Sequence, residues 1–474
     1  MKSETIAAIA TAVSESGIGI IRISGPQALE TADRVFRTKS GKHRITKMET
    51  HTMHYGFIVD GPEAHMESMG EGWKDHIIDE VMAAVMKAPR SYTTEDTVEI
   101  SCHGGVLVMQ RILEAVLKNG ARIAEPGEFT KRAFLNGRID LSKAEAVIDV
   151  IHSRNEFALK SSVKQLKGSV SEAVKELRGD ILYEIAFIES ALDDPEHISL
   201  DGYSEHLLQK TESLMARIGG LISTADNGKM MKEGINTVIV GKPNAGKSSL
   251  LNLLVGEERA IVTEVAGTTR DVLQESIRLY GIGLNIIDTA GIRDTQDIVE
   301  KIGVERAKKY AAEADLILYV VDASVPLDES DFEIIPLTAE KNTIILLNKT
   351  DLECVVEEDD LLKRIPNRNV QVLRTSTKEN TGIEEFENTV KDMFFQGKLH
   401  MNEEVIITNM RHKEALQNAY DSLVMVKESL DMDMPEDFYS IDLMSAYASL
   451  GSIIGEEVGE DLVNEIFSKF CMGK

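Results

Sequence analysis

The spacing of apolar and polar residues changes along the chain, and residues 1–119 form its first part. Short β-rich runs predict strands at 5–13, 19–24, 54–59, 79–86 and 97–101. Helical spacing covers residues 26–36 and 106–118, the second opened by His103-Gly104-Gly105. Residues 59–75 lack periodicity and are expected to form a loop. This part is therefore predicted to be a compact α+β domain.

From about residue 120 the apolar residues recur every three or four positions, which is typical of packed helices. Helices are predicted at 141–151, 156–190 and 203–226, and again from about residue 398 to the end. Pro195 should stop the second of these helices.

Strands alternate with helices between the two helical stretches, and they are expected at 238–240, 284–287, 316–321 and 343–347. This alternation predicts a mostly parallel sheet. The simplest architecture is a multidomain α/β protein, in which an α/β nucleotide domain is inserted into a discontinuous all-helical domain. Four consecutive domains are the alternative. The boundaries expected are 1–119, 120–233, 234–397 and 398–474.

Composition limits the class of protein further. A chain of 474 residues exceeds one hydrophobic core and suggests about three domains. The net charge of −27 argues against indiscriminate coating of nucleic acid or anionic membrane, but leaves RNA binding at a local patch or through a partner open. Three cysteines without C-x-x-C spacing fit a reducing cytoplasm. Without a signal-peptide core or an 18-residue apolar run, a cytoplasmic protein that does not span a membrane is expected.

Residues 241–248, Gly-Lys-Pro-Asn-Ala-Gly-Lys-Ser, have the spacing of a phosphate-binding loop between a strand and a helix. The backbone N–H groups of such a loop favour anionic phosphate. Lys247 is expected to reach the terminal phosphates, and Ser248 to ligate Mg²⁺. The nucleotide contacts predicted here are Asn244, Ala245, Gly246, Lys247, Ser248 and Ser249.

Three further motifs follow in the order expected of a Ras-like GTPase. The carboxylate of Asp288 can hold Mg²⁺ through water, and the N–H of Gly291 can meet the γ-phosphate. The carboxylate of Asp351 can accept from two N–H groups of guanine that adenine does not offer, which selects GTP over ATP. The contacts predicted in these motifs are Asp288, Thr289, Ala290, Gly291, Asn348, Lys349, Asp351, Ser376, Thr377 and Lys378.

The segment between the phosphate loop and Asp288 is expected to be a switch. Thr269 can complete the Mg²⁺ shell, whereas Arg270 faces either the phosphates or solvent. Ile292 stands where Ras-like GTPases have a glutamine that orients water, so another group must do so. Asn244 is a candidate ligand of a monovalent cation. The candidates to position the water are Asp294, Asp297 and Glu300.

Segments outside the nucleotide motifs resemble one family closely. These segments are residues 5–11, 17–25, 91–96, 103–105, 126–130, 132–137, 144–146 and the terminal Phe-Cys-Met-Gly-Lys at 470–474. On these segments and the GTPase motifs, the chain resembles the MnmE (TrmE) family of tRNA-modification GTPases from end to end. It departs from the family at residues 13–16, where a basic glycine-rich loop is usual, and at Arg138, where a lysine is frequent.

The resemblance implies an N-terminal folate-binding and dimerising domain, a helical domain and a potassium-activated G domain. With the FAD-containing partner MnmG, the family adds aminomethyl or carboxymethylaminomethyl groups to C5 of the wobble uridine of certain tRNAs. The cofactors implied are GTP or GDP, Mg²⁺, K⁺ and a tetrahydrofolate in its 5-formyl or methylene form. The assembly implied is a homodimer that joins MnmG in a heterotetramer and acts on tRNA.

The resemblance also implies roles for single residues. Glu300 matches the glutamate that positions the hydrolytic water, which leaves the role of Arg270 open. Cys471 matches a cysteine required for modification. The potassium ligands implied are Asn244, Thr263, Val265 and Thr268, in a nucleotide-contacting loop of Thr263, Glu264, Val265, Ala266, Gly267, Thr268 and Thr269. The folate contacts implied are Arg22, Glu99, Arg138 and Lys474.

Two other function classes are alternatives. A ribosome- or RNA-associated regulatory GTPase would hydrolyse GTP without modification chemistry. A basic RNA-binding appendage with a G-x-x-G loop would favour it, whereas the residues after the G domain are acidic and helical. A P-loop kinase is disfavoured by residues 348–351 and by the lack of an evident base to activate an acceptor.

Overall fold

The computed structural model forms two compact units, and each is described by itself. One comprises Met1–Ile148, Gln165–Arg178 and Leu450–Lys474, and the other comprises Asp149–Lys164 and Gly179–Ser449. The residues that the structure describes are 4–39, 44–60, 72–153, 155–194, 196–200, 202–256, 275–279, 282–287, 310–339, 341–365, 370–395, 405–456, 458–470 and 473. Within these ranges, we find no helix with the length and apolar character needed to cross a membrane.

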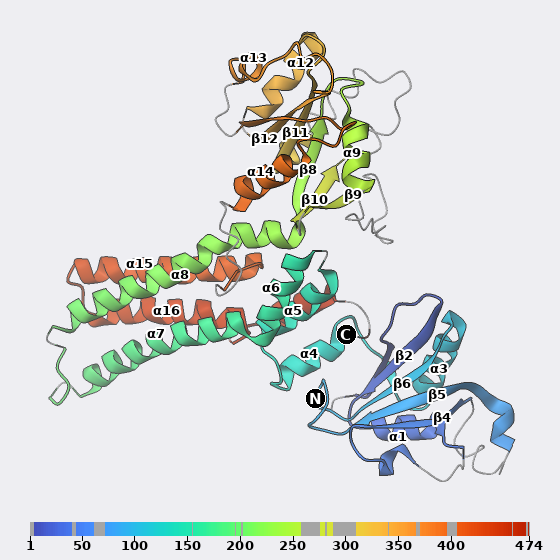
Figure 1. Ribbon diagram of the computed structural model, residues 1–474. Helices are drawn as coiled ribbons and strands as arrows, with labels where there is room; N and C mark the ends of the chain where they lie inside the picture. Colours follow the sequence, from blue (N-terminus) through green and yellow to red (C-terminus); the bar gives the residue numbers. More distant parts are fainter. Residues whose placement is uncertain are drawn as a thin grey trace. The chain divides into compact units, whose positions relative to one another are not determined.

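The first unit contains a seven-stranded sheet in the order β3-β4-β5-β6-β2-β1-β7 (Figure 1). Alternate residues of the central strands, such as Ile21, Ile23 and Ile100, are buried against α1 and α3. The bounds are β1 Ile6–Ile9, β2 Ser16–Ser24, α1 Ala28–Val35, β3 Phe36–Arg37, η1 Ile45–Lys47, β4 Thr52–Val59, η2 Gly72–His76, β5 Ile77–Met86, β6 Thr97–Gly104, α3 Val106–Lys118 and β7 Arg122–Ile123.

The part of the chain after β7 is mainly helical as far as β8, and again after α14, and one sequence prediction for it is wrong. Residues 156–190 form two helices because the backbone of Gly168 has φ 112°, in the left-handed region where an α-helix does not continue. The bounds are α4 Glu128–Leu135, α5 Leu141–His152, α6 Glu156–Lys167, α7 Ser169–Asp193, α8 Tyr203–Glu233, α15 Met410–Asp431, α16 Glu436–Ile454 and α17 Glu460–Ser468.

The second unit contains a six-stranded sheet in the order β13-β12-β11-β8-β10-β9, parallel except for β9. Its central strands are buried on both faces, since neighbouring β11 residues Leu318 and Tyr319 belong to different cores. The bounds are β8 Ile235–Val240, α9 Lys247–Gly256, β9 Glu275–Leu279, β10 Ile282–Ile287, β11 Leu316–Asp322, α12 Glu329–Ile334, η3 Ile335–Thr338, β12 Asn342–Asn348, α13 Glu358–Leu362, β13 Val370–Arg374 and α14 Ile383–Phe395.

Helices that precede this sheet in the sequence pack against helices that follow it. Figure 1 draws α7, α8, α15 and α16 as long helices side by side. Lys427 of α15 pairs with Glu212 of α8 at 2.7 Å, and Ser440 of α16 donates to Glu189 of α7 at 3.0 Å. The predicted fold class, with a discontinuous helical domain and an inserted α/β domain, is therefore confirmed.

Candidate nucleotide site

The phosphate loop runs from the end of β8 to the start of α9, and two glycines fit it closely to its surroundings. Gly241 has φ 151°, and an added Cβ would lie 2.3 Å from the carbonyl oxygen of Val320 on β11. Gly246 has φ 104°, and its added Cβ would lie 2.1 Å from Nδ2 of Asn348. Only glycine fits either position, so the loop is a cradle whose backbone a ligand can approach closely.

Lys247 is folded onto this loop. Its Nζ donates to the carbonyl oxygens of Gly241 and Lys242, both at 2.7 Å. Burial lowers the pKa of Lys247 to about 8, because desolvation disfavours the ammonium form. A neighbouring phosphate would oppose that effect, so the residue suits an anionic ligand.

Asn348, at the end of β12, joins three of the predicted motifs. Its buried side chain donates from Nδ2 to the carbonyl oxygen of Ala245 at 2.9 Å, and its Oδ1 accepts from the N–H of Thr377 at 3.2 Å. One amide thus connects the phosphate loop, the Asn348–Asp351 loop and the loop at 376–378. A satisfied buried amide of this kind fixes the relative positions of its partners.

The carboxylate of Asp351 is oriented by its neighbours in the base-recognition loops. Its Oδ1 accepts from the hydroxyl of Ser376 at 2.8 Å, and its Oδ2 lies 3.6 Å from Nζ of Lys378. The Ser376 hydrogen bond, aided by Lys378, holds the pKa of Asp351 below its usual range. An ionised carboxylate is the acceptor that the two N–H groups of guanine require.

Lys349 has a partner that the sequence did not indicate. It adopts φ 66° and forms an ion pair with Asp322 at the end of β11. Burial opposes ionisation of Asp322, but Lys349 and Ser324 outweigh it and lower the pKa of the carboxyl group. An acidic residue at the carboxyl end of a parallel strand, where ligands bind in such sheets, was the available signal.

The predicted folate residues Arg22 and Glu99 are opposite each other on β2 and β6. Nε of Arg22 lies 2.7 Å from Oε1 of Glu99, and its Nη1 donates to the carbonyl oxygen of Gly473 at 2.8 Å. The guanidinium carbon also lies 5.6 Å from the ring centroid of Phe129. Gly473 therefore meets the strand pair that carries these two charges.

Arg138 lies at a pocket of about 730 Å³ in the same unit. Its Nη1 donates to the carbonyl oxygen of Ser91 at 2.7 Å, and its guanidinium carbon is 5.1 Å from the ring centroid of Tyr92. Burial raises the pKa of Tyr92, while Thr130, Arg22 and Arg138 lower it in part. The charges of Arg22 and Arg138 therefore both influence Tyr92, so these two predicted folate residues belong to one region of the unit.

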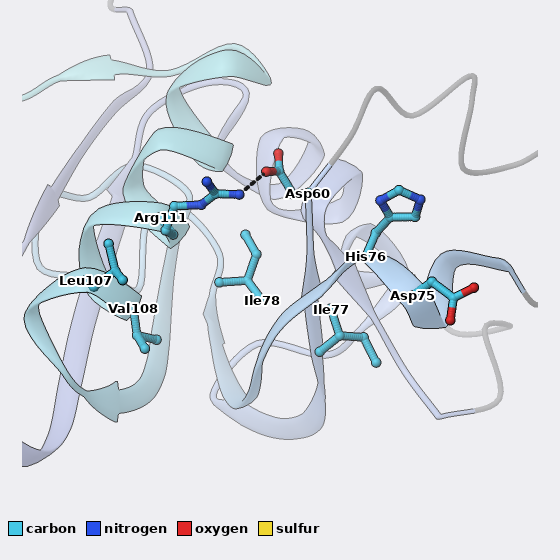
Figure 2. A pocket seen from close by; sticks show the side chains of 8 residues that line it. All are labelled: Asp60, Asp75, His76, Ile77, Ile78, Leu107, Val108 and Arg111. Atoms are coloured by element: carbon cyan, nitrogen blue, oxygen red, sulfur yellow. Dashed lines mark hydrogen bonds and ion pairs between the residues drawn. The ribbon is translucent and has the colours of Figure 1, made fainter.

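A second pocket, of about 390 Å³, opens near the ends of β4, β5 and α3 (Figure 2). Arg111 and Asp60 form an ion pair of 2.6 Å at its edge. Its lining contains none of the predicted site residues and consists of Asp60, Asp75, His76, Ile77, Ile78, Leu107, Val108 and Arg111.

Several predicted residues lie outside the described part of the chain, so their positions stay predictions. In the nucleotide site they are Thr263, Glu264, Val265, Ala266, Gly267, Thr268, Thr269, Arg270, Asp288, Thr289, Ala290, Gly291, Ile292, Asp294, Asp297 and Glu300. At the chain's end they are Cys471 and Lys474.

A mostly parallel α/β domain with a phosphate loop after β8, joined through Asn348 to guanine-reading loops, defines a P-loop GTPase. Family models extend this assignment to the rest of the chain. A model described as the GTP-binding protein TrmE N-terminus matches residues 5–138, and one described as the MnmE helical domain matches residues 141–471. The chain belongs to the MnmE family.

Two relatives support this membership over the full length. A tRNA modification GTPase MnmE from Lachnoclostridium phytofermentans is 58% identical over 476 residues, covering 100% of both chains. The protein of the same name from Clostridioides difficile is 48% identical over 471 residues, covering 99% of both. Among solved structures, Aquifex aeolicus Era bound to GDP.AlF4- is 27% identical, with a TM-score of 0.25 over 40% of this chain and 67% of that one.

Proposed function

We propose that this chain is a GTPase of tRNA modification, acting on C5 of the wobble uridine with an FAD-containing partner of the MnmG type. The observation that carries the proposal is the bridge formed by Asn348 between the phosphate loop and the guanine-reading loops. It occurs in a chain 58% identical, end to end, to a tRNA modification GTPase. We place the domain boundaries at 119, 233 and 397, and the protein in the cytoplasm.

The nucleotide would be GTP with Mg²⁺, activated by K⁺. Ser248 and Thr269 would hold Mg²⁺. Asn244 would contribute its amide oxygen to K⁺, and its exposed position at the loop surface, with φ 62°, fits that role. Thr263, Val265 and Thr268 would complete the cation's ligands.

Hydrolysis would depend on Glu300 to position the attacking water, since Ile292 has no polar group for this task. The potassium ion would supply positive charge at the phosphates, and pairing of two G domains in a homodimer would complete the site. Replacing KCl by NaCl should then slow GTP hydrolysis, and equal rates in the two salts would remove the potassium assignment.

The one-carbon unit would come from a tetrahydrofolate bound in the N-terminal domain, and FAD on the partner would supply the redox chemistry. The donor set is chemically suited to this ligand. The carboxylate of Glu99 can accept from pterin N–H groups, and Arg22, Arg138 and Lys474 can pair with glutamate carboxylates. Cys471 would serve the modification step. Two positions later in the sequence, the carbonyl oxygen of Gly473 accepts from Arg22.

The deciding experiment is the wobble-uridine modification profile of tRNA from cells that lack this chain. We expect loss of the modification, with recovery by the wild-type gene and no recovery by Lys247→Ala, which cannot hold the phosphates. An unchanged profile in the deletion strain would contradict the proposal. It would favour the regulatory GTPase that hydrolyses GTP without modification chemistry.

A further inference from the structure

The second residue of the phosphate loop, Lys242, is tied to the start of α12. Its Nζ lies 2.7 Å from Oδ2 of Asp331 and 3.0 Å from Oδ2 of Asp328. The Lys242 side chain is only 11% exposed, and that of Asp331 is 1% exposed. The phosphate-loop pattern leaves this position unspecified, so the sequence alone assigns it no role.

Asp331 is a buried carboxylate, and both of its oxygens have polar partners. Its Oδ1 accepts from the hydroxyl of Tyr319 at 2.8 Å, and its Oδ2 accepts from the N–H of Asp328 at 3.0 Å. A buried carboxylate is tolerated only when a countercharge and hydrogen bonds compensate for lost water. Lys242 supplies the countercharge, and although burial opposes its charged form, Asp331 and Asp328 raise its pKa.

The backbone of Lys242 meets the phosphate-binding lysine. Its carbonyl oxygen accepts from Nζ of Lys247 at 2.7 Å, while its side chain reaches Asp331. A continuous series of contacts therefore leads from Tyr319 on β11, through Asp331 and Lys242, to Lys247. On the other side of the loop, Gly241 packs against the backbone of β11. Lys242 is the point at which the first turn of the loop is anchored to α12.

We propose that Lys242 and Asp331 form a positioning pair that holds the phosphate loop in the conformation that binds nucleotide phosphates. This inference rests on the nucleotide binding proposed above. Removing the pair frees the first turn of the loop, so part of the binding free energy must be spent on ordering it again. The expected cost is about tenfold in nucleotide affinity, the size of one charge-assisted hydrogen bond.

The test is the affinity of the full-length chain for fluorescent mant-GDP in the presence of Mg²⁺ and KCl. Lys242→Met should raise Kd about tenfold, and Lys242→Arg should restore it to within about threefold, because a guanidinium can reach the same carboxylate. Asp331→Asn should also raise Kd. The double variant should bind no more weakly than whichever single variant binds more weakly, because both changes remove the same ion pair.

Asp328→Asn is the matched control. It removes the more exposed carboxylate from Lys242 but keeps a good N-cap for α12, so Kd should stay within about twofold. If wild type binds and Lys242→Met binds equally well, or the two single effects add, the pair has no positioning role. Failure of the wild-type chain to bind would instead overturn the nucleotide binding itself. If Asp331→Asn fails to fold, the comparison of Lys242→Met with Lys242→Arg still tests the positioning role.

Discussion

Lys247 should make the affinity for GDP depend on pH between 7.0 and 8.5. Burial lowers its pKa from 10.5 to about 8 in the unbound chain, so the side chain loses its proton across this range. A phosphate held at Lys247 favours the ammonium form, so binding must raise the pKa and take up a proton. The affinity for GDP should therefore fall as pH rises, because a growing fraction of Lys247 must first be protonated.

The size of the change in affinity follows from the pKa of Lys247, which is about 8 in the unbound chain. Roughly a tenth of Lys247 is then neutral at pH 7.0, and about three quarters at pH 8.5. With the pKa of the bound form above about 10, the dissociation constant should rise about fourfold between these two pH values. At pH 8.5 each binding event should take up about 0.7 proton.

Calorimetric titration with GDP in two buffers of different ionisation enthalpy measures both quantities. Lys247→Arg is the matched control, because its guanidinium stays charged and the nucleotide's own titration is the same in both proteins. The reasoning is refuted if Kd rises equally in wild type and Lys247→Arg. It is also refuted if the heat of wild-type binding at pH 8.5 is independent of the buffer.

Three further outcomes follow from individual contacts. Gly246→Ala should abolish measurable GDP binding in the same titration, because the new methyl group would lie 2.1 Å from Nδ2 of Asn348; retained affinity would mean that the loop can shift without loss. Asp351→Asn should move the preference from GTP towards XTP, because an amide donates where guanine needs an acceptor, and competition between the two nucleotides checks this. Glu128→Gln should remove about 1 kcal/mol of stability near pH 6. Burial opposes ionisation of Glu128, but two arginines lower its pKa to about 2, so its contribution is present above pH 4.5 and lost as pH falls. Urea unfolding followed by Trp73, the single tryptophan, should show the two proteins converging near pH 2, and a constant difference would contradict this origin.

Elements with local signals were predictable to within a few residues. The helix expected at 106–118 is α3, because helical spacing after Gly105 is a property of the adjacent residues. The helix expected at 156–190 was wrong because apolar spacing continues across Gly168, whose backbone breaks it. Four of the described strands were not predicted: β3, β7, β9 and β13. All four lie at sheet edges, where pairing with a neighbouring strand decides their conformation.

The candidate site also has features that local motifs predicted and features that depend on contacts between distant residues. Sequence reasoning predicted Asn348 and Lys247 to be nucleotide contacts from motif spacing. It did not find the bridge from Asn348 to Ala245, or the ion pair of Lys349 with Asp322, because these contacts join separate strands of the sheet.

By itself, the sequence determined the class of protein, since the phosphate loop and the guanine-reading loops are short motifs whose chemistry depends on neighbouring residues. The tertiary structure decided which residues far apart in the sequence come into contact. Arg22 meets Gly473 across 451 residues, and Lys242 meets Asp331 at the start of another helix. Such contacts depend on strand order and helix packing, and many sequences with the same local spacing could place these side chains elsewhere.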